Sequence, residues 1–259
     1  MIFDCNAWLG KWPFRALKEN TPVDLLAVMD LYDIGWAAVS SLDAVFNRNA
    51  QPANELLAQS VAPYADRLFP LGAINPTYVK WEDDLTACKE RLGMKGVRIY
   101  PQYHDYELAG PLGRRVAAAC KERDLALFIT HRIEDPRQRI SLDPGKIVTF
   151  EDLARLVSAV PGVKIVFTNA RGNLAHHRLL QNELATQKWF MDLSLIEGAK
   201  DLASLVVSPE WNHLVFGTHG PLTYPACALL KLGLLDIDAK QQAAVEYGNA
   251  SEILGLQLA

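Results

Sequence analysis

Short runs rich in β-branched and aromatic residues alternate with amphipathic helical patterns along the whole chain, and this rhythm limits the possible folds most. The predicted strands are Ile2–Cys5, Trp36–Ser41, Leu68–Ile74, Gly96–Tyr100, Leu125–Thr130, Val163–Thr168, Trp189–Leu193 and Leu214–Gly217. Helical patterns between and after them cover Pro22–Asp33, Ala53–Tyr64, Trp81–Leu92, Leu112–Arg123, Thr149–Val160 and Ala239–Leu254. Strands that alternate with helices form a parallel sheet, and eight of them close most simply into a barrel. We therefore predict an α/β protein with a single (β/α)8 TIM-barrel domain over residues 1–259.

The residues at the expected starts and ends of the helices support this prediction. Thr21-Pro22 and Thr149 each precede acidic residues, as expected where a helix begins, and Gly35, Gly93 and Gly162 follow helical patterns where a helix should end. The competing fold is an open doubly wound sheet, which should carry a glycine-rich phosphate turn after its first strand. Here that turn reads Asp4-Cys-Asn-Ala-Trp-Leu-Gly10, so we favour the barrel.

Charge and composition exclude several classes of partner. The net charge of −4 leaves no basic footprint, so we expect neither nucleic acid nor an anionic membrane as a partner. No apolar run approaches the roughly 20 residues that span a bilayer, and we expect a cytoplasmic protein. The four cysteines are widely spaced without a C-x-x-C pair, which favours free thiols.

In a barrel of this kind the chemistry lies at the C-terminal ends of the strands. The candidate substrate-binding residues there are Asn6, Trp8, Arg98, Tyr100, Asn169, Arg171 and Ser194, and the candidate catalytic residues are His131 and His219. Either histidine could act as a general base, and two nearby imidazoles would lower each other's pKa. A carboxylate after the fifth strand, Glu134 or Asp135, could orient His131.

Arg98 is the candidate that constrains the ligand most. Strand alternation sends Arg98 and Tyr100 to one side and the apolar Val97 and Ile99 to the helix side, so Arg98 should point into the barrel. A buried guanidinium needs an anion, either an internal carboxylate such as Asp4 or a ligand. We therefore expect a small, anionic substrate.

Five ordered segments resemble the amidohydrolase-related family of metal-dependent hydrolases over nearly the whole chain. They are Tyr64-Ala-Asp-Arg-Leu-Phe-Pro-Leu-Gly-Ala-Ile-Asn-Pro76, Gly96-Val-Arg-Ile-Tyr-Pro101, Phe128-Ile-Thr-His131, Phe216-Gly-Thr-His-Gly-Pro221 and Gly248-Asn-Ala-Ser-Glu-Ile-Leu254. The resemblance implies a divalent metal held by a His-x-His pair, two further histidines and an aspartate. Of these five positions only His131 keeps the family's residue, because the others carry Asn6, Trp8, Asn169 and His219.

The sequence therefore favours an enzyme with an altered metal site. We expect a hydrolase that opens a lactone, amide or ester in a small carboxylate-bearing or cyclic substrate, with no metal ligand and no cofactor. One alternative is a catalytically inactive barrel that binds a small molecule or serves as an assembly subunit. The other keeps a divalent metal such as zinc through altered ligands, as a hydrolase or decarboxylase. The resemblance also makes a homodimer an expectation.

Overall fold

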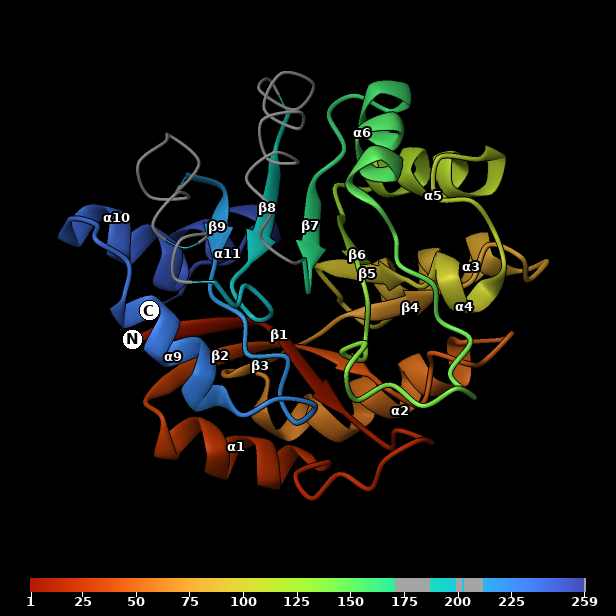
Figure 1. Ribbon diagram of the computed structural model, residues 1–259. Coiled ribbons are helices and arrows are strands. Elements are labelled where there is room, and N and C mark those ends of the chain that lie inside the picture. The colour runs from red at the N-terminus through yellow and green to blue at the C-terminus, as the bar shows by residue number, and fades with distance from the viewer. Residues whose placement is uncertain (171–186, 199–201, 203–211, 259) are drawn as a thin grey trace.

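The computed structural model describes residues 1–170, 187–198, 202 and 212–258. All paired strands run parallel and meet at the centre of the molecule (Figure 1). The strands are β1 (Ile2–Leu9), β2 (Ile34–Ser41), β3 (Leu68–Pro70), β4 (Gly72–Ile74), β5 (Gly96–Ile99), β6 (Ala126–Thr130), β7 (Ile165–Thr168), β8 (Trp189–Asp192) and β9 (Leu214–Val215).

The strands form two hydrogen-bonded runs, β1-β2-β3 and β4 to β9 in order. Leu71 joins the runs, since its backbone N donates to Val39 O at 2.8 Å between β3 and β4. At the other edge, Cys5 N donates to Phe216 O at 2.9 Å, which brings the first strand against the segment after β9. The predicted (β/α)8 barrel is confirmed, with β3 and β4 as halves of its third strand. The division of residues 1–259 into one domain stays a prediction.

Helices surround the strands (Figure 1). They are α1 (Pro22–Leu31), α2 (Gln51–Val61), the 3-10 turn η1 (Ala62–Tyr64), α3 (Trp81–Thr86), the π-helical turn η2 (Ala87–Arg91), α4 (Pro101–His104), α5 (Pro111–Glu122), α6 (Phe150–Ala159), α9 (Pro225–Gly233), α10 (Ala239–Ala243), the π-helical turn η4 (Ala244–Gly248) and α11 (Asn249–Leu254). The predicted starts at Thr21 and Thr149 are confirmed, because each hydroxyl accepts from the backbone N of Asp24 or Asp152 and each aspartate bonds back.

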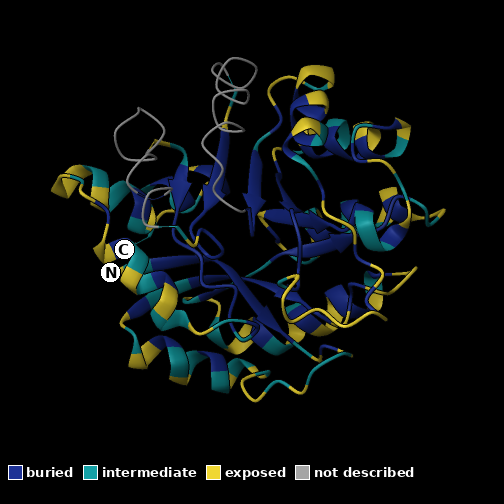
Figure 2. Ribbon diagram, in the orientation of Figure 1, coloured by how far each residue is buried: buried dark blue, intermediate teal, exposed yellow. Residues whose placement is uncertain are grey.

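Burial follows the strand alternation. Val97 and Ile99 belong to the apolar layer between strands and helices, whereas Phe3, Cys5 and Phe128 belong to a separate cluster of buried side chains. The strands are buried apart from a few partly exposed residues in β1, β2 and β3, and the fully exposed residues lie on the outer helix faces and in loops (Figure 2). All four cysteines are free thiols. Within the described ranges, no helix is both long and apolar enough to cross a bilayer.

Candidate active site

Four strand ends meet in one buried hydrogen-bond network. Asn6 Nδ2 donates to Asn169 Oδ1 at 2.6 Å and to Asp192 Oδ2 at 2.7 Å. Asn169 extends the network to His219, because its Nδ2 donates to Arg132 O at 2.7 Å and lies 3.2 Å from His219 Nδ1. Asn6, Asn169 and His219 are each no more than 1% exposed. The first, sixth, seventh and eighth barrel strands are thereby tied together at their C-terminal ends.

His219 is held as a neutral ring. Trp8 Nε1 donates to its Nδ1 at 3.0 Å, and its Nε2 lies 2.7 Å from Ile133 O, which can only accept. Burial lowers the pKa of His219 to about 3, although the hydrogen bond to Ile133 opposes this. The lowering that we expected from a neighbouring histidine is therefore supplied by burial, with the charges of Arg98, Arg15 and Arg132 adding to it.

Arg98 points into the barrel as predicted, but it forms no ion pair with a carboxylate of the described residues. Its Nε donates to Ser40 Oγ and its Nη1 to Thr130 Oγ1 and Thr168 Oγ1, all at 2.9 Å. Among the described residues its Nη2 has no hydrogen-bond partner, although the side chain is fully buried. The guanidinium carbon lies 4.3 Å from the centre of the Trp8 ring.

Of the two kinds of anion considered for Arg98, the internal carboxylate Asp4 forms no hydrogen bond with it. Asp4 instead accepts hydrogen bonds from the backbone N of Asn6 and from the backbone N and hydroxyl of Thr218. Burial lowers the pKa of Arg98 to about 10, so the side chain stays charged near neutral pH. Arg98 is thus a buried cation whose Nη2 has no hydrogen-bond partner in the described part of the chain, although the carboxylates of Asp192 and Asp4 act on its charge from a distance.

Tyr100 and Ser194 lie at the edges of this centre. The Tyr100 ring is 6.2 Å from the Trp8 ring, and its buried hydroxyl has no partner among the described residues. Burial raises the pKa of Tyr100, which keeps the phenol a neutral donor. Ser194 Oγ donates to Asn169 Oδ1 at 3.0 Å. Both predicted residues therefore neighbour the network.

His131 occupies a separate position. Its Nδ1 donates to Val148 O at 2.6 Å, and Val148 N donates to His131 O at 2.9 Å. Its ring packs against Phe150 and Phe167, with centroids 6.0 and 5.7 Å away. The backbone of Val148 therefore orients His131, in place of the carboxylates that we expected, because Glu134 faces Arg15 and Asp135 faces Arg137.

Asp192 is a central residue of the network that was not among the predicted site residues. It ends β8, and its Oδ1 accepts from Asn169 N at 2.8 Å while Oδ2 accepts from Asn6. Burial raises the pKa of Asp192 to about 6. A Cβ on Gly217 would lie 2.7 Å from Asp192 Oδ2, so glycine there leaves room for the carboxylate. Its position at a strand end was the available signal. Arg171, also predicted, lies outside the described residues.

The sequence matches the amidohydrolase family over residues 5–256. The chain belongs to this family. No curated protein matches at a significant level.

Solved structures share the fold at low sequence identity. The 5-carboxyvanillate decarboxylase of Sphingomonas paucimobilis superposes with a TM-score of 0.75 at 17% identity, covering 99% of both chains. A dihydroxybenzoic acid decarboxylase of a Polaromonas species, with bound manganese and 2-nitroresorcinol, has a TM-score of 0.75 at 14% identity and covers 98% of this chain and 96% of its own. A probable 2-pyrone-4,6-dicarboxylic acid hydrolase of Acinetobacter baumannii, with bound citric acid, has a TM-score of 0.71 at 13% identity and covers 98% of this chain and 99% of its own.

These relatives correct one expectation. We expected no cofactor, and the manganese in the Polaromonas amidohydrolase-fold enzyme contradicts this by pointing to a metal in the family. The positions that the sequence resemblance assigns to metal ligands do not fit that role here. Trp8 offers no ligand atom, both nitrogens of His219 are hydrogen-bonded, and no three His, Cys, Asp or Glu side chains gather around a point in the described residues. We therefore derive no step through a metal ion.

Proposed function

We propose that this amidohydrolase hydrolyses a small, carboxylate-bearing cyclic compound, a lactone, amide or ester, at the C-terminal end of its barrel. The observation that supports this proposal is the burial of the charged Arg98 side chain. It is fully buried and charged, with a guanidinium nitrogen that has no acceptor among the described residues.

Arg98 is proposed as the anchor for the substrate carboxylate. A carboxylate binds a guanidinium strongly, and the interaction gains strength where water is excluded. Tyr100 is close enough to influence the pKa of Arg98, and its hydroxyl is a second buried donor without an acceptor in the described structure. The buried ring of Trp8 lies beside both groups, with the Arg98 guanidinium over one of its faces, and an aromatic side chain of this kind suits a planar ligand. A planar, cyclic carboxylate therefore matches the donors and the aromatic surface together.

His131 is proposed as the general base. Because Nδ1 donates to Val148 O, the neutral ring carries its lone pair on Nε2, the nitrogen that would take a proton from water. Asn169 and Ser194 support the site from behind, because the Asn169 amide donates to Arg132 O and the Ser194 hydroxyl donates to Asn169 Oδ1. His219 stays a predicted catalytic residue, although in this geometry its lone pair already accepts from Trp8.

The test is a turnover assay with and without added Mn²⁺. The substrates are 2-pyrone-4,6-dicarboxylate as a lactone, and dihydroxybenzoate and 5-carboxyvanillate as decarboxylation substrates. We expect lactone opening, with kcat lowered about 100-fold or more in His131→Asn and KM raised in Arg98→Met. His213→Asn is the matched control, because this histidine stacks on Trp189 and bonds its carbonyl.

Other outcomes would contradict the proposal in separate ways. Carbon dioxide release without lactone opening would identify a decarboxylase. Binding without turnover, weakened by Arg98→Met and unaffected by His131→Asn, would identify a binding protein. Unchanged kcat in His131→Asn would remove this residue from the mechanism.

A further inference from the structure

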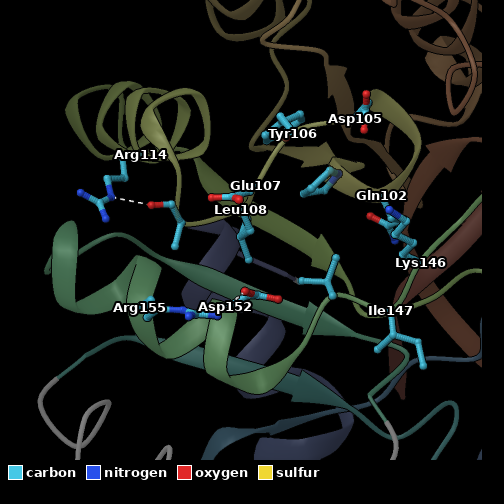
Figure 3. A pocket seen from close by; sticks show the side chains of 13 residues that line it. Gln102, Asp105, Tyr106, Glu107, Leu108, Arg114, Lys146, Ile147, Asp152 and Arg155 are labelled. Carbon is cyan, nitrogen blue, oxygen red and sulfur yellow. Dashed lines mark hydrogen bonds and ion pairs between the residues drawn. The ribbon is translucent and has the colours of Figure 1, made fainter.

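A cavity of about 600 Å³ lies beside the candidate active site, between the segment that follows β5 and the segment 146–148 that leads into α6. Figure 3 shows Arg114 at one end and Lys146 with Gln102 at the other. The volume falls in the range of small-molecule sites. None of the residues proposed above to bind or convert substrate lines it.

Two lining residues are bonded directly to the candidate active site. Val148 accepts a hydrogen bond from His131 Nδ1 at 2.6 Å and donates one to His131 O at 2.9 Å. Gln102 Nε2 donates to Thr130 O at 2.9 Å, and the Thr130 hydroxyl in turn accepts from Arg98. A molecule that contacts Val148 and Gln102 therefore contacts the residue that orients His131 and a residue bonded to Thr130, one of the partners of Arg98.

The polar groups of the cavity specify what could bind. Gln102 Oε1 is buried and has no partner among the described residues, so it requires a donor. Arg155 and Asp152 neutralise each other at 2.7 Å. By contrast, two cations, Lys146 and Arg114, and two carboxylates, Glu107 and Asp105, form no ion pair with any residue that the structure describes.

Charges of both signs thus remain, together with apolar surface from Pro101, Leu108 and Val148. A simple anion would satisfy Lys146 and be repelled by Glu107, and a simple cation would meet the reverse. A ligand with an ammonium, a carboxylate and an N–H or O–H donor complements all three requirements.

We propose that this cavity is a second binding site, which takes a zwitterion of the amino-acid or dipeptide type and controls the orientation of His131 through Val148. Lys146 binds the carboxylate, Glu107 binds the ammonium group, and Gln102 Oε1 accepts from the ligand. Contact with Val148 changes the hydrogen bond to His131 Nδ1. Binding at this site is separate from the proposed hydrolysis, so either can fail without the other.

The experiment screens the standard amino acids and glycylglycine, each at about 10 mM, by saturation-transfer NMR against the full chain. We expect at least one to bind and to shift the ¹⁵N resonances of the His131 ring. Lys146→Met and Glu107→Gln should each weaken binding about tenfold, as expected for loss of a charged hydrogen bond. Ile147→Trp, at a half-exposed lining position, should block the cavity without disturbing the core.

Lys240→Met is the matched control, because Lys240 is an exposed lysine in α10 and does not line the cavity. The site is overturned if no compound binds, or if binding is equal in wild type, Lys146→Met and Ile147→Trp. The coupling is overturned if a compound binds and the His131 resonances stay unchanged. Neither result depends on turnover of a lactone.

Discussion

Replacing Arg98 with methionine separates a structural role of this cation from a ligand-binding role. Burial outweighs the attraction of nearby charges and lowers the pKa of Arg98 from its ordinary value to about 10. This corresponds to a cost of about 3 kcal/mol for keeping the charge in the folded protein. Methionine removes that cost and fills much of the same space. The hydroxyls of Thr130 and Thr168 lie 3.2 Å apart and can bond each other once the guanidinium is gone.

We therefore expect the unfolding free energy of Arg98→Met to equal that of wild type within about 1 kcal/mol, or to exceed it by up to about 3 kcal/mol. Ligand affinity should fall at the same time. Stability that rises when a residue is removed, while binding is lost, indicates that the residue is kept for function. The measurement is urea denaturation followed by circular dichroism, paired with titration of a planar aromatic carboxylate.

Arg67→Met is the matched control. Arg67 binds Asp30 at 2.7 Å and also donates to the carbonyls of Gly35 and Ile34, so it has a partner at each nitrogen. Its replacement should lower stability by about 1–3 kcal/mol. A loss of more than about 1 kcal/mol in Arg98→Met would refute the reasoning, because it would mean that the three hydroxyl contacts outweigh the cost of burial.

Three further predictions concern the network and the thiols. Gly217→Ala should lower the free energy of unfolding by about 1–3 kcal/mol in urea denaturation, because the new methyl group would lie 2.7 Å from Asp192 Oδ2. Gly233→Ala is the control and should be neutral or stabilising, because open space surrounds that position. Equal effects of the two substitutions would contradict the close approach at Gly217. His219 should stay neutral between pH 5 and 8 in an NMR titration, because its pKa in the folded state is about 3. The free energy of unfolding should fall as the pH drops below the pKa of histidine in the unfolded chain, near 6.5, by about 2 kcal/mol at pH 5 relative to His219→Gln. A titration midpoint above pH 5 would disprove this. Cys227 is exposed and should react with a thiol reagent in the native protein. The three other thiols should react only after unfolding, since they are buried and burial raises the pKa of each: Cys5, Cys88 and Cys120. Simultaneous labelling of all four would contradict the fold.

The barrel was predictable because its signals are local. Apolar runs locate the strands, and the threonines before α1 and α6 accept from a backbone N three residues on. The break at Leu71 was not predictable, since it depends on a contact between distant residues. There the side chain of Asn54 bonds the backbone of Ala73 twice: Asn54 Oδ1 accepts from Ala73 N at 2.7 Å, and Asn54 Nδ2 donates to Ala73 O at 3.0 Å. No sequence pattern predicts such a contact between a helix side chain and the backbone of a strand.

The candidate site divides in the same way. That Asn6, Trp8, Asn169 and His219 come together follows from the strand-end rule alone. The partners of each side chain do not follow, because they depend on distances across the barrel. Arg98 meets three hydroxyls in place of Asp4, and this choice is settled by which strands face one another.

The bond from Cys5 N to Phe216 O has a consequence for how the protein is made. A ribosome adds about 5–20 residues per second, so roughly 10–40 seconds separate the synthesis of these two partners. During that interval one edge of β1 has no strand to pair with, and seven of its eight residues are buried in the finished protein. An exposed apolar edge is a template for pairing with another chain. The nascent polypeptide should therefore depend on chaperones until its last strand emerges, and slowing elongation late in the message should lower the yield of folded protein.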